Sequence, residues 1–426
     1  MREMKDSGIE WIGATPETWK MIPLKYLASY NDEVLSENTD DEFEFDYIEI
    51  GSVQYGRGII YTEHMKFKNA PSRARRIVRK DDIIVSTVRT YLKAVATIPA
   101  CNNLLIASTG FIVIRPHKVL PRFMNYALLS ESFISLVESH STGISYPAIN
   151  SVDVVKFKIP VPCGSEQERI AAFLDAECAE IDTVLEKTRA SIEEYKKLKQ
   201  AVITQAVTKG IRGDRPMKDS GIEWIGDIPA EWGVVPHKRI MHKVKEICEQ
   251  YNGEDIISLT VNGVVKRDLT AGGKMPTSFD GYQYVEPNDL LLCLFDIDVT
   301  PRCVGVVRDY GVTSPAYSRF VMYDGYYNAY YDYLLRMIDD NKVFVHLSKN
   351  LRSSLTESDF GAIKTCAPPL AEQKCIAAFL DVRCDEIDAL IAKKQQYLTE
   401  IENYKKSLIY EYVTGKKEVK TSVLAD

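Results

Sequence analysis

Two long segments of the chain show apolar residues that alternate by four and by three positions. Neither segment contains Pro or Gly before Gly210 and Gly415. A heptad pattern kept over about five repeats is typical of a helix with one narrow apolar stripe. The pattern therefore predicts two helices of about 40 residues, each about 60 Å long at 1.5 Å per residue. The stripe comprises Leu174, Cys178, Ile181, Leu185, Thr188, Ile192, Tyr195, Lys199, Val202 and Ala206, and then Leu380, Cys384, Ile387, Ile391, Lys394, Leu398, Ile401, Lys405, Leu408 and Tyr412.

A long helix with one narrow apolar stripe cannot bury that stripe alone. One interpretation is that each helix packs on its own domain. We favour a second one, in which the two helices pack on each other as an antiparallel pair about an internal twofold axis. Thr188, Lys199, Lys394 and Lys405 interrupt the stripe, and polar positions of this kind cost stability and can fix register.

The chain contains two copies of one unit. The decapeptide MKDSGIEWIG occurs at 4–13 and again, identically, at 217–226. The segment EQERIAAFLDAECAEID at 166–182 returns at 372–388 with 12 of 17 positions identical. Between them lie two variable regions, 24–165 and 237–371, with little similarity. Uniform drift after a duplication would blur every segment alike, so we favour two different specificities on one repeated scaffold.

The variable regions show short strand-like runs followed by one helix-like run. The first region has 46–50, 82–88 and 110–114 and then a helix-like 122–138; the second has 255–260, 289–295 and 303–307 and then 328–348. The sequence thus predicts a mixed α/β protein with two globular domains separated by two long antiparallel helices. The expected division is 1–165 for the first domain, 166–210 for the central helix, 211–371 for the second domain and 372–426 for the C-terminal helix and tail.

Composition excludes several classes of protein. With 45% hydrophobic and 27% charged residues among 426, a mostly disordered chain is excluded. No apolar run is long enough to cross a membrane, and the first residues lack the apolar core of a signal peptide. Nine scattered cysteines without ligand spacing predict reduced thiols and a cytoplasmic location.

The net charge of -7 argues at first against a nucleic-acid binder. The charge is, however, uneven. Residues 24–165 carry 16 bases and 15 acids, and residues 237–371 carry 15 bases and 17 acids, so -7 - (+1) - (-2) leaves -6 on the remainder. Nine bases gather between Lys66 and Lys93, while nine acids and no base occupy 32–49. The sign of the whole chain is therefore the wrong quantity for judging DNA binding.

Candidate DNA contacts are basic, hydroxyl and aromatic residues in loop-like segments. Arginine reads guanine with two hydrogen bonds, and hydroxyl groups bond phosphates or base edges. A solvated basic face is the plainer interpretation of such a cluster. In the first region the candidates are Arg57, Arg73, Arg75, Arg76, Ser86, Thr87, Arg89, Tyr91, Lys93, Ser145 and Tyr146; in the second they are Asn262, Lys266, Arg267, Lys349 and Arg352.

Catalytic motifs are missing from the sequence. There is no phosphate-binding G-x-x-x-x-G-K-[ST], no G-x-G-x-x-G, no H-E-x-x-H and no G-x-S-x-G. The Asn/Asp-Pro-Pro-aromatic tetrapeptide of an amino-methyltransferase is also missing. Asp296 and Asp298 follow a strand-like run and could form a metal or catalytic pair, although strand-end solvation is the more common role. We predict no catalytic residue, no metal site and no cofactor on this chain.

The duplicated motifs carry a family resemblance. The decapeptide followed by Pro and Trp, and the P-x-x-x-EQ-x-x-IAAFLD-x-x-x-x-EID motif, each occur twice beside long helices and divergent middles. In this combination the chain resembles the specificity subunit of a type I restriction–modification system over nearly its whole length. Residues 82–92 and 107–113 also resemble its target recognition domains, while 289–295 and 313–317 depart from that pattern.

The resemblance implies a non-catalytic reader of double-stranded DNA. Each recognition domain would read one half of a bipartite, asymmetric site, and the helices would fix the gap between the halves. Two methyltransferase subunits that hold S-adenosylmethionine would dock on the scaffold. Restriction subunits that use ATP and Mg²⁺ for translocation and cleavage would join them.

Two other functions remain open from the sequence. One is a self-contained DNA methyltransferase or nuclease with unrecognised motifs. The other is a protein adaptor whose unlike domains hold two proteins on a coiled-coil rod without reading DNA.

Overall fold

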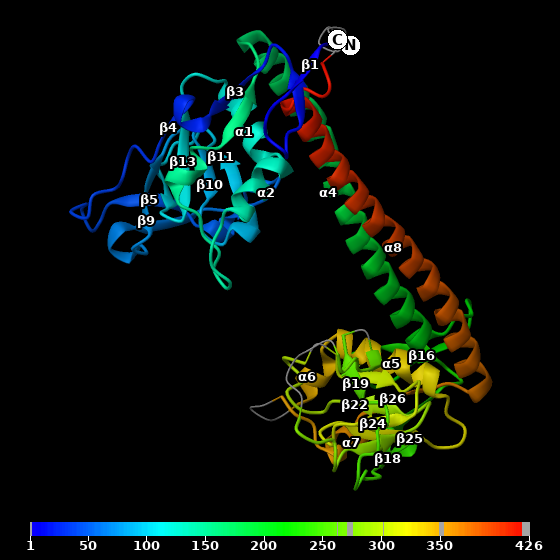
Figure 1. The fold of residues 1–426 in the computed structure, drawn as a ribbon. Helices are drawn as coiled ribbons and strands as arrows, with labels where there is room; N and C mark the ends of the chain where they lie inside the picture. The colour runs from blue at the N-terminus through cyan, green and yellow to red at the C-terminus, as the bar shows by residue number, and fades with distance from the viewer. Residues whose placement is uncertain (1, 262, 271–275, 301, 349–352, 420–426) are drawn as a thin grey trace. The chain divides into compact units, whose positions relative to one another are not determined.

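The computed structural model describes residues 2–261, 263–270, 276–300, 302–348 and 353–419. The chain divides into two compact units (Figure 1). Unit 1 is Met1–Arg189 with Gln396–Asp426, and unit 2 is Ala190–Gln395. The division passes through both long helices. Each unit therefore contains one decapeptide, one variable region and part of each long helix, whereas the sequence suggested the helices as segments of their own.

The helices include the two long ones expected from the heptad pattern. The central one ends directly before Gly210, whose φ of +75° is the left-handed conformation that glycine adopts at helix ends. Within the described residues no helix is both long and apolar enough to cross a membrane. The helices are α1 Pro121–Leu129, α2 Glu131–Ser139, α3 Ser151–Val154, α4 Gly164–Lys209, α5 Asn328–Asp340, α6 Val343–Leu347, α7 Glu357–Ala362 and α8 Leu370–Val413.

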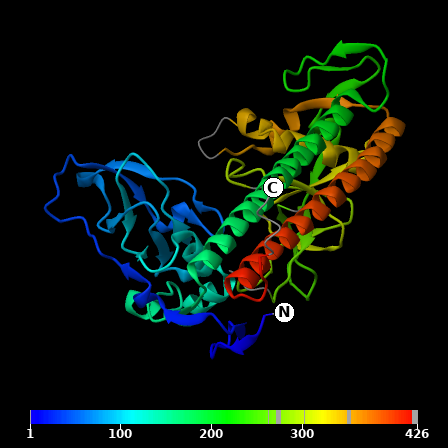
Figure 2. The ribbon, with the colours of Figure 1, turned by 90° about the horizontal axis from the view of Figure 1, so that it is seen from above.

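In unit 1, α4 and α8 pack along the predicted stripe. Leu174, Cys178 and Leu185 are buried in one cluster with Leu408. Two ion pairs join the helices: Asp182 with Lys405 and Arg189 with Glu402, at 2.7 and 2.6 Å. Higher numbers on α4 meet lower numbers on α8, so the helices are antiparallel here, as Figure 2 shows. This confirms the predicted antiparallel pairing.

In unit 2 the same pairing occurs with the partners exchanged. Lys199 of α4 bonds Asp388 of α8 at 2.6 Å, and these residues are the repeat equivalents of Lys405 and Asp182. The Nζ atom of Lys394 lies over the Tyr195 ring. The lysines that interrupt the stripe therefore turn out of it, toward carboxylates or an aromatic ring on the opposite helix.

The variable region of unit 1 contains two four-stranded sheets. One has the order β11-β10-β13-β4, the other β8-β5-β12-β9, and β14 pairs with β3 beside them. The strands are β1 Met4–Asp6, β2 Ala14–Pro16, β3 Lys20–Pro23, β4 Ala28–Tyr30, β5 Glu44–Ile48, β6 Val53–Gln54, β7 Gly58–Ile59, β8 Glu63–Lys66, β9 Ala74–Val78, β10 Ile83–Ser86, β11 Val95–Thr97, β12 Leu105–Ser108, β13 Phe111–Pro116 and β14 Lys158–Val161.

Unit 2 repeats part of this architecture. Its four-stranded sheet has the order β18-β25-β22-β23, and β17 pairs with β26 as β3 pairs with β14. The strands are β15 Met217–Asp219, β16 Asp227–Pro229, β17 Gly233–Pro236, β18 Met241–Val244, β19 Ile257–Thr260, β20 Gly263–Lys266, β21 Gln283–Val285, β22 Leu290–Leu292, β23 Val304–Val306, β24 Gly311–Thr313, β25 Ser318–Met322 and β26 Lys364–Ala367. Together these observations confirm the predicted mixed α/β class.

Each helix-like run of the variable regions forms two helices instead of one. In 122–138 the break is Ser130, whose extended backbone ends α1 and whose hydroxyl accepts a hydrogen bond from Phe133 N at the start of α2. In 328–348 the break is Asn341 and Lys342, where Lys342 has a φ of +56°. The apolar period continues across both breaks, because each short helix buries a face in the same core, and the period alone does not reveal the caps.

An arginine before each decapeptide and a tryptophan after it bind the start of a long helix. Trp19 is buried and donates its indole N–H to Glu166 Oε2 at 2.9 Å, while Arg2 bonds the other oxygen of that carboxylate. In unit 2, Trp232 and Arg215 hold Glu372 in the same way. The acidic residue in the first helical turn, which also suits the helix dipole, is thus an anchor for the repeated motif.

Candidate nucleic-acid interface

A buried ion pair supports the strand that leads to the candidate loop in unit 1. Asp82 is buried and accepts hydrogen bonds from Arg79 N and from Arg115 Nε and Nη2, each at 2.8 Å. Two nitrogens of one guanidinium therefore fix the carboxylate directly before β10, and charged hydrogen bonds of this kind are strong and directional. The next strand residues are buried, and the loop begins where β10 ends.

The loop that follows, 87–93, is held by its backbone. Thr87 donates two hydrogen bonds to the Gly110 carbonyl, from its backbone N at 2.8 Å and from its Oγ1 at 2.9 Å. A Cβ at Gly110 would lie 2.6 Å from the Ile50 Cδ1 atom and 2.8 Å from a Val88 methyl group, so a larger residue there would displace these side chains. Arg89 and Lys93 both adopt left-handed backbone conformations, with φ of 51° and 53°. These constraints present the side chains between them in one defined arrangement.

A second loop, 141–148, lies against the first. Ala148 pairs with Val88 in an isolated bridge, and the Thr90 hydroxyl donates to Ser141 Oγ at 2.9 Å. The Arg89 guanidinium lies over the Tyr146 ring, 5.3 Å from its centroid. We call 88–93 and 141–148 the tip loops of unit 1. They bring together residues that are more than fifty positions apart in the sequence.

Several predicted contacts meet on the tip loops. Arg89, Tyr91, Ser145 and Tyr146 are all exposed there, and Lys93 bonds Glu138 at 3.3 Å. Ser86 and Thr87, which were also predicted as contacts, are instead buried beneath the loop and support it. The exposed group combines a planar cation with aromatic rings, and such a group can bond guanine edges or stack on bases.

Part of the basic cluster between Lys66 and Lys93 is paired with acids and does not form an open cationic patch. Lys66 and Lys68 both bond Glu42, and Arg79 bonds Glu33 at 2.7 Å. The acids of 32–49 thus neutralise part of the cluster across the sheet. Of these nine bases, Arg73, Arg75, Arg76, Lys80 and Arg89 make no ion pair within the described parts of the chain.

The remaining predicted arginines of unit 1 belong to other segments, the turn between β6 and β7 for Arg57 and the region of β9 for the others. Arg75 donates to the Ala74 carbonyl and lies over the Phe67 ring. Arg76 is half-buried, and burial lowers its pKa. Arg73 is exposed, and Arg57 is exposed beside Gln54. The structure therefore singles out Arg89 as the exposed arginine that is fixed by its own backbone and by a ring.

Unit 2 contains a similar acid–arginine pair with a different loop, and Arg319 and Arg115 occupy different register positions on their strands. Buried Asp289 accepts bonds from Glu286 N and from Arg319 Nε, each at 2.6 Å, as Asp82 does from Arg79 N and Arg115. Leu355 N bonds Leu294 O as Ile149 N bonds Thr87 O. By this correspondence Asp296, with a φ of 46°, occupies the position of Arg89.

The predicted contacts of unit 2 are only partly described. Lys266 bonds Asp255 at 2.6 Å, and Arg267 N donates to Ile256 O. Asn262, Lys349 and Arg352 lie outside the described residues. Sequence reasoning did not place Asp296 in this interface, although it follows Asp289 at the same interval as Arg89 follows Asp82. This equal spacing was the feature of the sequence that could have identified Asp296 as a candidate contact. Within the described chain, no group of three His, Cys, Asp or Glu is arranged to hold a metal ion.

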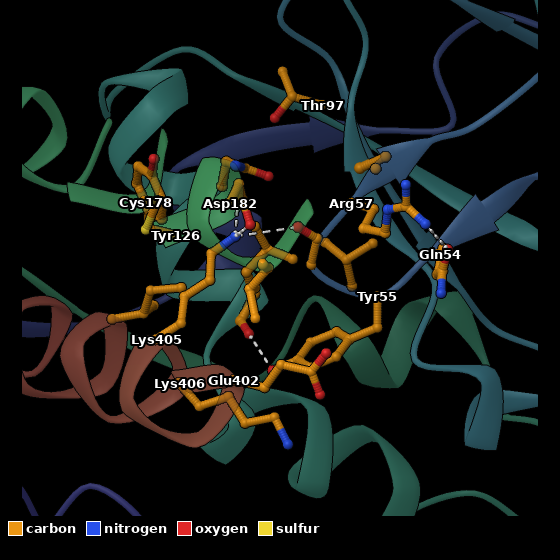
Figure 3. A pocket seen from close by; sticks show the side chains of 18 of the residues that line it. Gln54, Tyr55, Arg57, Thr97, Tyr126, Cys178, Asp182, Glu402, Lys405 and Lys406 are labelled. Atoms are coloured by element: carbon orange, nitrogen blue, oxygen red, sulfur yellow. Dashed lines mark hydrogen bonds and ion pairs between the residues drawn. The ribbon is translucent and has the colours of Figure 1, made fainter. Parts of the chain in front are cut away.

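A pocket of about 540 Å³ lies in unit 1 between the variable region and the helix pair (Figure 3). Lys405 crosses it: its Nζ donates to both oxygens of Asp182 at 2.7 Å and to the Gly56 carbonyl at 3.4 Å. Lys406 lies over the Tyr55 ring, and burial raises the pKa of Tyr55 to about 12. Of the cations that line the pocket, Lys405 and Arg189 are paired with acids and Lys406 faces a ring, whereas Arg57 bonds the Gln54 side-chain oxygen.

Comparison with known proteins finds similarity to one family. Residues 16–194 match the family described as "Type I restriction modification DNA specificity domain". The chain is 24% identical to the putative type I restriction enzyme MjaX specificity subunit of Methanocaldococcus jannaschii, over 96% of each chain. It is 25% identical to the type I restriction enzyme MjaVIII specificity subunit of the same organism, over 95% of this chain and 94% of that one.

Solved structures agree in fold. A chain from a structure described as "Structural basis underlying complex assembly and conformational transition of the type I R-M system" is 20% identical, with a TM-score of 0.74 over 95% of this chain and 99% of that one. The HsdS subunit from Thermoanaerobacter tengcongensis is 21% identical, with a TM-score of 0.50 over 95% and 98%. With the duplicated motifs and the antiparallel helices, these matches show that the chain is similar to type I restriction–modification specificity subunits, in sequence over nearly its whole length and in fold.

Proposed function

We propose that this chain is the DNA sequence-specificity subunit of a type I restriction–modification system and that it is not itself catalytic. The observation that carries the proposal is the pair of tip loops in unit 1, where a buried acid–arginine pair supports exposed Arg89, Tyr91 and Tyr146. Unit 2 repeats the support and changes the exposed side chains. A repeated support with different exposed residues is what two unlike half-sites require.

Each unit would read one half of a bipartite, asymmetric site in the major groove. Correct bidentate contacts each contribute roughly 1–3 kcal/mol of discrimination. The helix pair would set the gap between the halves, because α4 and α8 run without interruption through 46 and 44 residues. Near-neutral variable regions would bind DNA weakly alone and depend on partner subunits for phosphate contacts.

Partner subunits would supply the chemistry. Two methyltransferase subunits that hold S-adenosylmethionine would dock on the helix pair, where Val382, Leu390 and Tyr404 are exposed outside the buried stripe. Restriction subunits with ATP and Mg²⁺ would join them. Flipping of the target adenine would fall to the methyltransferase. All of this would take place in the cytoplasm, where the nine free cysteines stay reduced.

The deciding experiment is methylome sequencing of a host that carries this chain with its methyltransferase partner. We expect one bipartite motif with two unlike halves and a fixed gap. Inserting one heptad into α4 and one into α8 at equivalent positions is expected to change the gap and leave both halves unchanged. An altered half-site with an unchanged gap would contradict the role of the helices as a spacer.

Two controls separate the alternatives. Methyl transfer by this chain alone would show a self-contained methyltransferase. A complex with the methyltransferase subunit whose DNA binding has no salt dependence would favour a protein adaptor, because phosphate contacts release counterions and give a steep salt slope.

A further inference from the structure

Ile144 stands at the outer end of the second tip loop. Its side chain is fully exposed, more than any other large hydrophobic side chain in the described parts of the chain. Figure 1 shows the segment after α2 projecting from the body of unit 1. Exposed apolar side chains are common singly, but one held at the end of a projecting loop beside candidate base-reading residues is placed for contact with a ligand.

The loop that carries Ile144 is closed at its base. Thr142 N donates to Ala148 O and Ala148 N donates to Thr142 O, both at 2.9 Å. Gly143 has a φ of +107°, and a Cβ there would lie 3.2 Å from the Tyr146 carbonyl, so the turn requires glycine. The Ala148 bridge to Val88 fastens this base to the loop of Arg89. Ile144 is therefore presented by a preorganised turn, and little entropy remains to be lost on binding.

The surroundings of Ile144 favour DNA as the ligand. Tyr146, two residues further on, lies under the Arg89 guanidinium, and Tyr91 is exposed on the adjacent loop. Among the described residues, the acid that an ion pair places near this group is Glu138, which is bonded by Lys93. An apolar side chain among an unpaired arginine and aromatic rings matches a major groove, where guanine offers acceptors and thymine offers a methyl group.

We propose that Ile144 is a specificity-determining residue of the first half-site and that it packs on the 5-methyl group of a thymine. This inference rests on the proposed function of unit 1 as a DNA reader. Arg89 and Ile144 then have separate tasks: the guanidinium bonds base-edge acceptors, and the isoleucine selects for a methyl group that no hydrogen bond can detect.

The test uses the complex with the methyltransferase subunits and duplexes that carry the mapped site. Each thymine of the first half-site is replaced singly by deoxyuridine, which lacks only the methyl group. We expect one replacement to weaken binding about fourfold, the effect of leaving one methyl group in water. In the Ile144→Ala complex the same replacement is expected to have no effect. Ile211→Ala, at an exposed isoleucine just after α4, is the matched control and should keep the full deoxyuridine effect.

Each other outcome overturns the inference. If no replacement weakens binding, or if Ile144→Ala leaves the deoxyuridine effect unchanged, Ile144 does not contact a methyl group. If Ile144→Ala weakens binding equally to thymine and deoxyuridine duplexes, the side chain acts as a wedge or contacts a protein partner. These results leave the proposed function intact, whereas a wild-type complex that does not distinguish the mapped site from random DNA removes both.

Discussion

The two variable regions use one support to present opposite charges. Asp82 and Asp289 occupy the same place before a central strand, each pairs with an arginine of the neighbouring strand, and the residue in left-handed conformation that follows is Arg89 in unit 1 and Asp296 in unit 2. Asp82, Asp289 and Arg319 are buried and Arg115 is 25% exposed, whereas the presented residues are exposed. The difference teaches that the support tolerates different exposed side chains, because those side chains contribute little to its packing. Specificity can therefore change without loss of the fold.

Removing the buried acid should have the largest effect, and it should differ between the units. Asp289→Ala leaves Arg319, whose side chain is 6% exposed, with Glu246 at 3.8 Å as its remaining acid among the described residues, and we expect a loss of about 3–5 kcal/mol in the stability of unit 2 because the buried charge loses its close partner. Asp82→Ala should cost unit 1 less, because Arg115 is 25% exposed and keeps Glu33 at 2.7 Å. Hydrogen exchange followed separately for peptides of each unit measures both. Equal losses would show that the two supports are energetically alike.

A second contrast lies where Leu24 of unit 1 corresponds to His237 of unit 2. His237 is fully buried, neither ring nitrogen has a hydrogen-bond partner among the described residues, and burial lowers its pKa to about 4. The unfolded chain binds the proton at about pH 6.5, so the stability of unit 2 is complete above pH 6.5 and falls as the pH drops toward 4, by up to about 3 kcal/mol.

His237→Leu copies unit 1 and should remove this acid sensitivity. We expect the variant to be more stable than the wild type at every pH, since an unsatisfied polar group leaves the core. Urea unfolding between pH 4 and 7 is the measurement, with Leu24→Ala as a control that lowers stability without a pH dependence. If the stability of unit 2 in the wild-type chain did not change over this pH range, His237 would not be the cause of an acid sensitivity.

The presented residues themselves should affect DNA reading with a smaller free energy. Arg89→Ala is expected to weaken discrimination at one position of the first half-site by roughly 1–3 kcal/mol, and Asp296→Ala should alter only the second half-site. Binding of the complex to single-base variants of the mapped site measures both. If Arg89→Ala weakens all sequences equally and reduces the salt slope by about one, Arg89 contacts a phosphate instead of a base.

The smallest expected effect concerns Lys199 of α4 and Lys405 of α8, which are equivalent positions of the two repeats. Lys199 is 30% exposed and bonds Asp388, whereas Lys405 is 13% exposed and bonds both Asp182 and Gly56. Lys199→Met should change the stability of unit 2 by less than about 1 kcal/mol, because exposed ion pairs contribute little. Lys405→Met should cost unit 1 more, roughly 1–2 kcal/mol. Thermal unfolding of the two variants compares them, and a larger cost for Lys199→Met would reverse the ranking.

Much of the scaffold could be predicted from local pattern. The heptad stripe, the glycine at the end of α4 and the duplicated decapeptide are all visible in the sequence, and burial of Leu174, Cys178 and Leu380 follows the stripe. The site was harder to predict. Arg89 and Tyr146 were both chosen as candidates, but their contact was not, since it depends on how two distant loops meet. Ser86 and Thr87 were chosen as contacts and are buried, because β10 is covered on both faces and this burial continues to Thr87 beyond the end of the strand.

The charge of the first variable region shows the same limit. Lys66 and Lys68 read as part of a basic patch until β8 pairs with β5 and brings them to Glu42. The sequence by itself determined the repeat, the long helices and their antiparallel pairing, because these follow from periodicity and identity along the chain. The tertiary structure alone decided which charges stay unpaired and which side chains share the tip loops. Electrostatic pairing and loop contact depend on distances through space, and no local pattern records those distances.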